Sequence, residues 1–99
     1  MTTRNGVPEG WSERYKTALN FTLPDGVEFY STPGHGFLQV DLRKHTAKVS
    51  SYDYRLGNDF VLLEEDCSMT MWLAEHGLIP MEAYIQHMIS TIKREEVKA

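Results

Sequence analysis

The sequence has one cysteine, no long apolar run, and no lysine or arginine between residues 56 and 92. The single Cys67 cannot form an intramolecular disulfide, which agrees with a reducing compartment. The longest apolar run, residues 60–63, is far shorter than the roughly 20 residues that cross a bilayer. Residues 1–10 contain no apolar segment of the kind found in secretory signals. We therefore expect a cytoplasmic protein with no membrane-spanning segment.

The composition that is present is that of an ordinary globular protein. The 99 residues are 41% hydrophobic and 24% charged, which is too apolar for a disordered segment and too polar for a membrane protein. No internal repeat, low-complexity tract or Gly/Pro/Ser-rich linker divides the chain. We expect a single domain over residues 1–99, in which residues 1–10 form a loose N-terminal arm.

Acidic side chains are concentrated where basic ones are missing. The net charge is only −4, but the segment between residues 56 and 92 is uniformly acidic. Such a surface repels phosphate backbones and attracts a basic partner, although a charge run often serves only as a solvated face. The carboxylates of this segment, which are our candidate partner-binding residues, are Asp59, Glu64, Glu65, Asp66, Glu75 and Glu82.

Alternating apolar and polar residues predict several strands in the first two thirds of the chain. Pro24, Asp25 and Gly26 favour a hairpin turn between the first two strands, because proline presets φ and glycine accepts a positive φ. Residues 11–18 fit a helical stripe and a strand equally well, and their structure stays undecided. The expected strands are 19–23, 27–31, 37–42, 47–54 and the apolar run 60–63.

Two helices are expected after the last strand. Asp66 is a natural N-cap for a helix over about residues 67–76, which Gly77 is suited to end. Pro80 suits the first turn of a second helix, whose apolar stripe consists of Met81, Tyr84, Ile85, Met88 and Ile92. The fold class predicted is therefore α+β: an antiparallel sheet of about four to five strands followed by two C-terminal helices packed on one face. Any part of the second stripe that the sheet leaves uncovered is a candidate homodimer contact.

The first candidate for chemistry is His35, which stands between Gly34 and Gly36 at an expected strand break. Glycines let the backbone turn sharply and let another group approach the imidazole closely. The same tripeptide also occurs in ordinary solvated turns, so the signal is weak by itself.

The second candidate is Cys67, directly after Glu64, Glu65 and Asp66. A thiol in the first turn of a helix feels the positive end of the dipole, which favours the thiolate, but adjacent carboxylates oppose that charge. With His35 as base, a small Cys–His hydrolase is the enzymatic alternative. Packing of a small, buried cysteine behind a strand end is the non-functional alternative.

Other ligands find less support. A metal-stabilised domain would use His35 with the junction carboxylates and with His45 or His76, yet no zinc-site spacing is present. No glycine-rich phosphate loop follows a strand, so we expect no cofactor. The basic bend at Arg43 and Lys44 is small beside the acidic half, so we do not expect direct nucleic-acid binding.

Two short motifs resemble those of a known group of proteins. Residues 32–36 read Thr-Pro-Gly-His-Gly and residues 64–67 read Glu-Glu-Asp-Cys. In this order they resemble short uncharacterised phage- and plasmid-encoded proteins, over roughly residues 27–75. The resemblance implies a mobile-element origin and no particular activity. Because both motifs fall at strand ends, we expect His35 and the 64–67 junction to meet, either as a structural lock or as a functional site.

The sequence thus favours a small non-catalytic protein-interaction module, with no catalytic residues assigned. Its expected partner is a host or phage protein bound through the acidic surface. Inhibition of a host defence system, in the manner of an anti-CRISPR protein, is one role that such binding would serve. The alternative is a Cys–His hydrolase or a metal-stabilised domain that uses His35 and Cys67.

Overall fold

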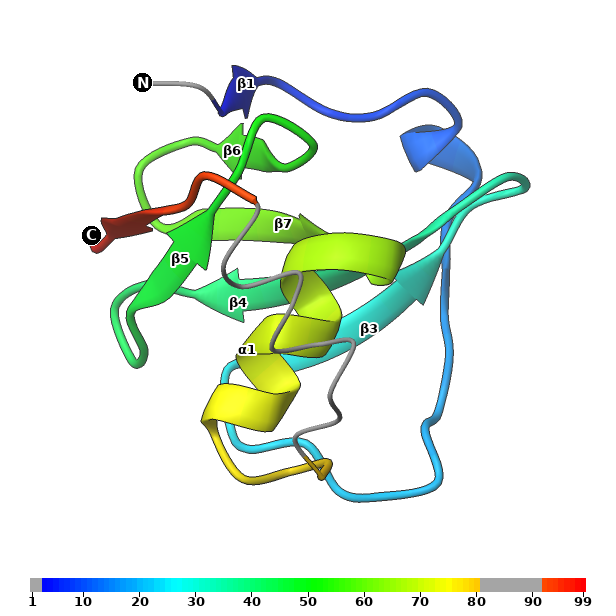
Figure 1. Cartoon of the computed structure of the whole chain (residues 1–99). Coiled ribbons are helices and arrows are strands. Elements are labelled where there is room, and N and C mark those ends of the chain that lie inside the picture. The colour runs from blue at the N-terminus through cyan, green and yellow to red at the C-terminus, as the bar shows by residue number, and fades with distance from the viewer. Residues whose placement is uncertain (1–2, 81–91) are drawn as a thin grey trace.

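The described part of the chain forms two sheets, a helical segment after β7 and a short 3-10 helix near the N-terminus. The computed structural model describes residues 3–80 and 92–99. The larger sheet has the strand order β1-β6-β7-β4-β3-β2, and a second sheet pairs β5 with β8 (Figure 1). The elements are β1 (Arg4–Asn5), the 3-10 helix η1 (Trp11–Glu13), β2 (Tyr15–Lys16), β3 (Val27–Ser31), β4 (Gly36–Asp41), β5 (Ala47–Val49), β6 (Tyr54–Leu56), β7 (Phe60–Glu64), the π-helical turn η2 (Glu65–Met69), α1 (Thr70–Glu75) and β8 (Glu95–Val97).

The predicted architecture of four to five antiparallel strands followed by two packed helices is wrong. The main sheet has six strands and is mixed, because β1 pairs with β6 in parallel. The described C-terminal residues end in β8, which pairs with β5. The second helix and its dimer contact were predicted on residues that lie, except for Ile92, outside the described ranges. Residues 3–80 and 92–99 together give a fold that is mostly sheet.

The centre of the sheet follows the alternation in the sequence. The predicted strands at 27–31, 37–42 and 60–63 are confirmed as β3, β4 and β7. These three run antiparallel, with Leu38 opposite Phe29 on one side and opposite Leu63 on the other. Because strand side chains alternate between faces, this register places all three on the same face of the sheet.

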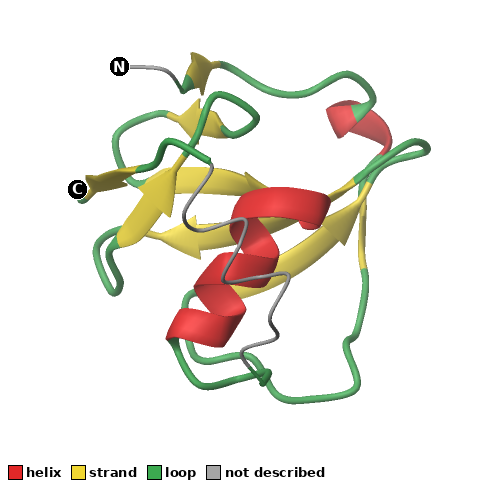
Figure 2. Cartoon of the chain, in the orientation of Figure 1, coloured by secondary structure: helices red, strands yellow, loops and turns green. Residues whose placement is uncertain are grey.

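Two other predicted strands are wrong. Residues 19–23 form no strand but an extended loop (Figure 2). Leu19, Phe21 and Leu23 still pack against the core, so their alternation reflects burial without sheet pairing. The turn at Pro24–Gly26 is present, since the Val27 N–H donates to Pro24 O and Gly26 has a φ of +86°. It connects this loop, rather than a strand, to β3.

The predicted strand over residues 47–54 is divided into two strands in different sheets. Its first part is β5 and its last residue begins β6. Between them the chain turns at residues 50–53, where the Asp53 N–H donates to Ser50 O. The buried Asp53 side chain, described below, is the physical reason for the interruption.

The helical segment starts two residues earlier than predicted. It runs as one π-helical turn and then α1, and Gly77 follows it with a φ of +72°, which confirms the expected C-terminal end. The N-cap is Glu64 rather than Asp66, because the Glu64 carboxylate accepts the Asp66 N–H at 3.0 Å. No helix within residues 3–80 and 92–99 is long and apolar enough to cross a membrane.

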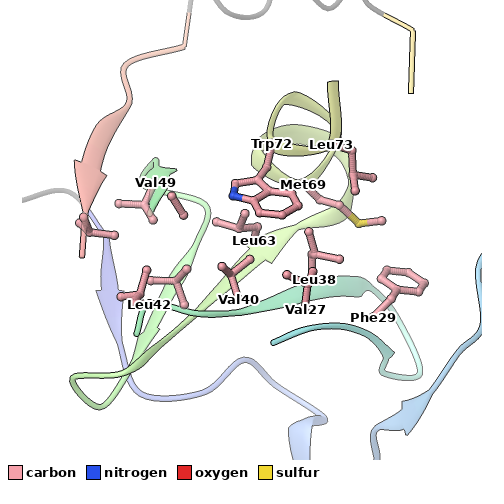
Figure 3. Packing of buried hydrophobic residues seen from close by; sticks show 13 residues of the cluster. Val27, Phe29, Leu38, Val40, Leu42, Val49, Leu63, Met69, Trp72 and Leu73 are labelled. Atoms are coloured by element: carbon pink, nitrogen blue, oxygen red, sulfur yellow. The ribbon is translucent and has the colours of Figure 1, made fainter. Parts of the chain in front are cut away.

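The main core lies between the helix and one face of the sheet. Trp72, Leu73 and Met69 point from the helical segment onto side chains of β3, β4 and β7 (Figure 3). Leu38, Val40 and Leu63 have no exposed surface, and each such burial contributes about 1.5–3 kcal/mol to folding. Val49 and Val97 extend this core to the small sheet.

The opposite face of the main sheet carries a smaller, aromatic cluster. Trp11, Phe37 and Leu62 are buried there, and Tyr30, Tyr54 and Leu56 pack at its margin. Trp11 comes from η1, which resolves the undecided segment 11–18 as a 3-10 helix followed by β2. Within the described residues, the N-terminal segment that contains η1 thus packs on this face.

Residues 3–10, expected to be part of a loose arm, run along the edge of the sheet from β1 to η1 (Figure 1). Arg4 and Asn5 pair in parallel with Tyr54 and Arg55 of β6. Thr3 is buried and donates to Ser50 O. This edge strand positions Arg4 beside the site described next.

Candidate functional site

The two sequence motifs meet at one end of the main sheet. Glu64 pairs with Phe37 across β4 and β7, so the 32–35 turn and the β7–helix junction are neighbours. The His35 Nδ1 lies 4.0 Å from Glu64 Oε1, which is a charge contact and too long for a hydrogen bond. The expected meeting of His35 with the junction is therefore confirmed.

The 32–35 segment is the tip of the β3–β4 hairpin rather than a break within a strand. The Thr32 N–H donates to His35 O at 2.7 Å, and the Thr32 hydroxyl accepts the His35 N–H. Gly36 is required by close packing, since a Cβ there would lie 2.7 Å from Phe29 Cζ and 2.8 Å from Glu65 Oε1. The motif thus holds the imidazole, which is 66% exposed, at the rim of the sheet.

Asp53 fixes the geometry of the junction. Its carboxylate is completely buried, and it accepts the Ser50 N–H at 2.7 Å and the Glu64 N–H at 2.8 Å. The hydroxyls of Ser50 and Ser68 donate to the same group. Burial raises the pKa of Asp53, against the opposing effect of these hydrogen bonds. One side chain therefore ties the 50–53 turn, the end of β7 and the helix together.

An open hollow of about 550 Å³ lies over this end of the sheet. We call it the Tyr54 hollow. Its apolar walls are Phe37, Tyr52, Tyr54 and Pro8. Phe37 and Tyr54 make an edge-to-face pair with centroids 6.0 Å apart, whereas Tyr52 is 51% exposed. An aromatic-walled hollow of this size is typical of a ligand or peptide site.

The carboxylates of Glu9, Glu64 and Asp66 and the guanidinium of Arg4 also line the hollow. The Arg4 guanidinium lies 4.6 Å from the Tyr54 ring centroid and donates to the Tyr54 hydroxyl at 2.7 Å. Burial raises the pKa of the Glu64 carboxyl, while the Asp66 N–H and His35 act in the opposite direction. The three carboxylates outnumber the one guanidinium.

Cys67 also lines the hollow and is half-buried. Burial raises the pKa of its thiol, and the Glu64, Asp53 and Asp66 carboxylates raise it further. In the described part of the chain, no hydrogen bond joins the His35 imidazole to the sulfur. The surroundings therefore favour the neutral thiol over the thiolate that nucleophilic catalysis needs.

The predicted acidic set does not form one continuous surface. Glu64 and Asp66 face the Tyr54 hollow, and Glu65 packs against Gly36. Asp59 lies before the start of β7, 3.9 Å from Arg43. Glu75 is bound by Arg94 at 2.7 Å and lies 3.6 Å from Lys48. Glu82 is outside the described residues.

The histidines proposed as metal ligands are in two separate places. His35 is at the hollow, whereas His45 and His76 pack around Trp72, with the His76 ring stacked at 3.7 Å. Across residues 3–80 and 92–99, no three His, Cys, Asp or Glu side chains gather closely enough to hold a metal ion. The His45 Nε2 instead contacts Asp25 O at 2.8 Å.

No protein-family model, curated protein or solved structure matches this chain. Sequence reasoning assigned no role at this site to Arg4, Glu9 or Asp53, and it considered Tyr52 and Tyr54 only as aromatic neighbours of the basic bend at Arg43 and Lys44. The only local signal was the Tyr-Asp-Tyr triplet at residues 52–54, because an aspartate between two aromatic residues is an unusual element of a strand.

Proposed function

We propose that this chain is a non-catalytic protein-interaction module that binds a basic partner protein through the Tyr54 hollow. The observation that carries the proposal is the surplus of carboxylates in an aromatic-walled hollow. Recognition sites combine such apolar area with a few placed polar groups. The raised pKa of the Cys67 thiol counts against a Cys–His hydrolase.

The proposal narrows the acidic surface to one place. Glu64 and Asp66 are retained as partner-binding residues, and Glu9 joins them because it lines the same hollow. Glu75 contributes less, since Arg94 and Lys48 already neutralise it. Under the resemblance to phage- and plasmid-encoded proteins, the partner is a host or phage protein, and inhibition of host defence is a role this binding would serve.

Site-specific crosslinking tests the proposal. A photoreactive phenylalanine analogue replaces Tyr52 in one protein and Tyr15 in another, because both positions are on the surface, with 51% and 61% exposure. After irradiation in bacterial host lysate, we expect a discrete protein adduct at residue 52 and none at residue 15. Equal labelling at both positions, or none at residue 52, contradicts the proposal.

Charge variants then test the acidic side of the hollow. Glu64→Gln keeps an oxygen that can accept the Asp66 N–H, so the helix cap is preserved while the charge is lost. Asp59→Asn is the matched control, because it removes one charge beyond the opposite end of β7. We expect the adduct to weaken in Glu64→Gln and to persist in Asp59→Asn. An equal loss in both would mean that only overall charge matters.

A further inference from the structure

The carboxylate side of the Tyr54 hollow has no strong cationic partner within the chain. No lysine or arginine nitrogen of residues 3–80 and 92–99 lies within 4.0 Å of the Glu9, Glu64 or Asp66 carboxylates, and residues 81–91 contain neither residue type. Among the histidines of the described residues, His35 reaches this distance, to Glu64. The Glu64 side chain is just 16% exposed, so little water compensates its charge.

The same face of the sheet repeatedly places a guanidinium on an aromatic ring. Arg4 lies over Tyr54 at 4.6 Å, and Arg14 lies over Trp11 at 4.8 Å and over Tyr30 at 5.5 Å. Tyr52, in contrast, is half exposed, and no cation of the described chain covers its ring. A planar guanidinium can bind a carboxylate with two hydrogen bonds while stacking on an aromatic face, which an ammonium cannot do.

We propose that the Tyr54 hollow binds an arginine side chain of the partner, with the guanidinium between the Tyr52 ring and the Glu64 and Asp66 carboxylates. This inference rests on the proposed function and names the chemistry of its partner. The volume of about 550 Å³ accommodates that side chain together with the flanking backbone of an extended peptide. A phosphate or an acidic peptide meets three carboxylates here and is repelled.

Three short peptides, identical except at one residue, provide the test. The central residue is arginine, lysine or citrulline, and citrulline is the neutral isostere of arginine. Binding to the full chain is followed by two-dimensional amide NMR. We expect saturable shifts at residues 52–54 and 64–67 with the arginine peptide, weaker binding with lysine, and no saturable shifts with citrulline.

Two variants assign the contacts. Loss of a charge-assisted hydrogen bond predicts about tenfold weaker arginine-peptide binding in Glu64→Gln. Loss of an exposed cation–π contact predicts about two- to fivefold weaker binding in Tyr52→Leu. Asp59→Asn is expected to bind as tightly as the unaltered chain. Unchanged amide spectra away from the hollow establish that each variant is folded.

Several outcomes overturn the inference. Equal binding of the arginine and citrulline peptides shows that the hollow does not recognise the positive charge. Equal binding of the arginine and lysine peptides shows that it does not recognise the planar guanidinium. Equal weakening in Glu64→Gln and Asp59→Asn indicates unspecific attraction. If residue 52 still crosslinks a partner while the arginine peptide fails to bind, the proposed function stands and the arginine assignment falls.

Discussion

Replacement of Gly36 by alanine tests whether the hairpin and the helix junction are packed as closely as the structure indicates. The added Cβ would lie 2.7 Å from Phe29 Cζ, 2.8 Å from Glu65 Oε1 and 2.9 Å from Glu65 Cδ. Glu65 is exposed, so its carboxylate can move aside. Phe29 is only 4% exposed, and its ring is held by the core. The cost is therefore set by Phe29.

Inserting a methyl group into a packed site costs about 1–3 kcal/mol. Alanine also lowers the conformational entropy of the unfolded chain, which stabilises the folded state by about 0.4–1 kcal/mol. We expect Gly36→Ala to lower the free energy of unfolding by about 1–2 kcal/mol, which corresponds to a fall of about 4–16 °C in the melting temperature. Urea unfolding followed by tryptophan fluorescence measures the change.

Gly34→Ala is the matched control in the same hairpin. No atom lies within 4 Å of the Cβ that this change adds, so we expect stability to stay constant or to rise by up to about 1 kcal/mol. Repeating Gly36→Ala in a Phe29→Leu background removes the end of the ring. The penalty should then shrink, with a coupling of about 1 kcal/mol between the two sites. Equal stability of the two alanine variants, or no coupling, would refute the reasoning.

Four further predictions concern the charged and polar groups. Asp53→Ala leaves the Ser50 and Glu64 N–H groups unpaired and should cost about 2–5 kcal/mol, measured by urea unfolding. Burial raises the pKa of Asp53 in the folded chain, so the folded state binds the Asp53 proton more tightly than the unfolded state does. The free energy of unfolding of the unaltered chain, relative to that of Asp53→Asn, should therefore fall as the pH rises from 3.8 through the folded pKa. A difference between the two proteins that stays constant with pH would contradict the shift. Glu75→Gln leaves the Arg94 guanidinium, whose side chain is 5% exposed, without its carboxylate and should cost about 1–3 kcal/mol. Lys16→Gln, at the exposed pair with Glu28, is the control and should change stability much less, because exposed ion pairs contribute little. Iodoacetamide should alkylate Cys67 more slowly at pH 7 than it alkylates a free cysteine, because the pKa of the Cys67 thiol is raised. Mass spectrometry of the folded chain follows the reaction. Alkylation faster than that of free cysteine would reopen the hydrolase alternative.

Local patterns predicted the parts of this fold that depend on local chemistry. The alternation in β3 and β4, the apolar run of β7 and the glycine after α1 all act within a few residues. These predictions were correct because burial of one strand face requires alternating apolar residues and a positive φ favours glycine, and both can be recognised in the sequence. The proximity of His35 to Glu64 followed from both motifs being at strand ends.

Long-range pairing explains what the sequence could not reveal. Arg4 and Asn5 pair with residues about fifty positions away, and no local pattern marks a two-residue parallel strand. Asp53 was not recognised because aspartate is almost never fully buried unless it is paired. The acidic segment suggested one surface, but Glu75 is neutralised by Lys48 and Arg94 from distant parts of the chain.

The small sheet has a consequence for the order of events during synthesis. Ala47 and Val49 of β5 pair with Val97 and Glu95 of β8, which leave the ribosome much later. Val97 is also part of the main core. In a nascent chain, the margin of the apolar core that Val97 covers therefore stays open to chaperones and proteases until residues 95–97 have left the ribosome.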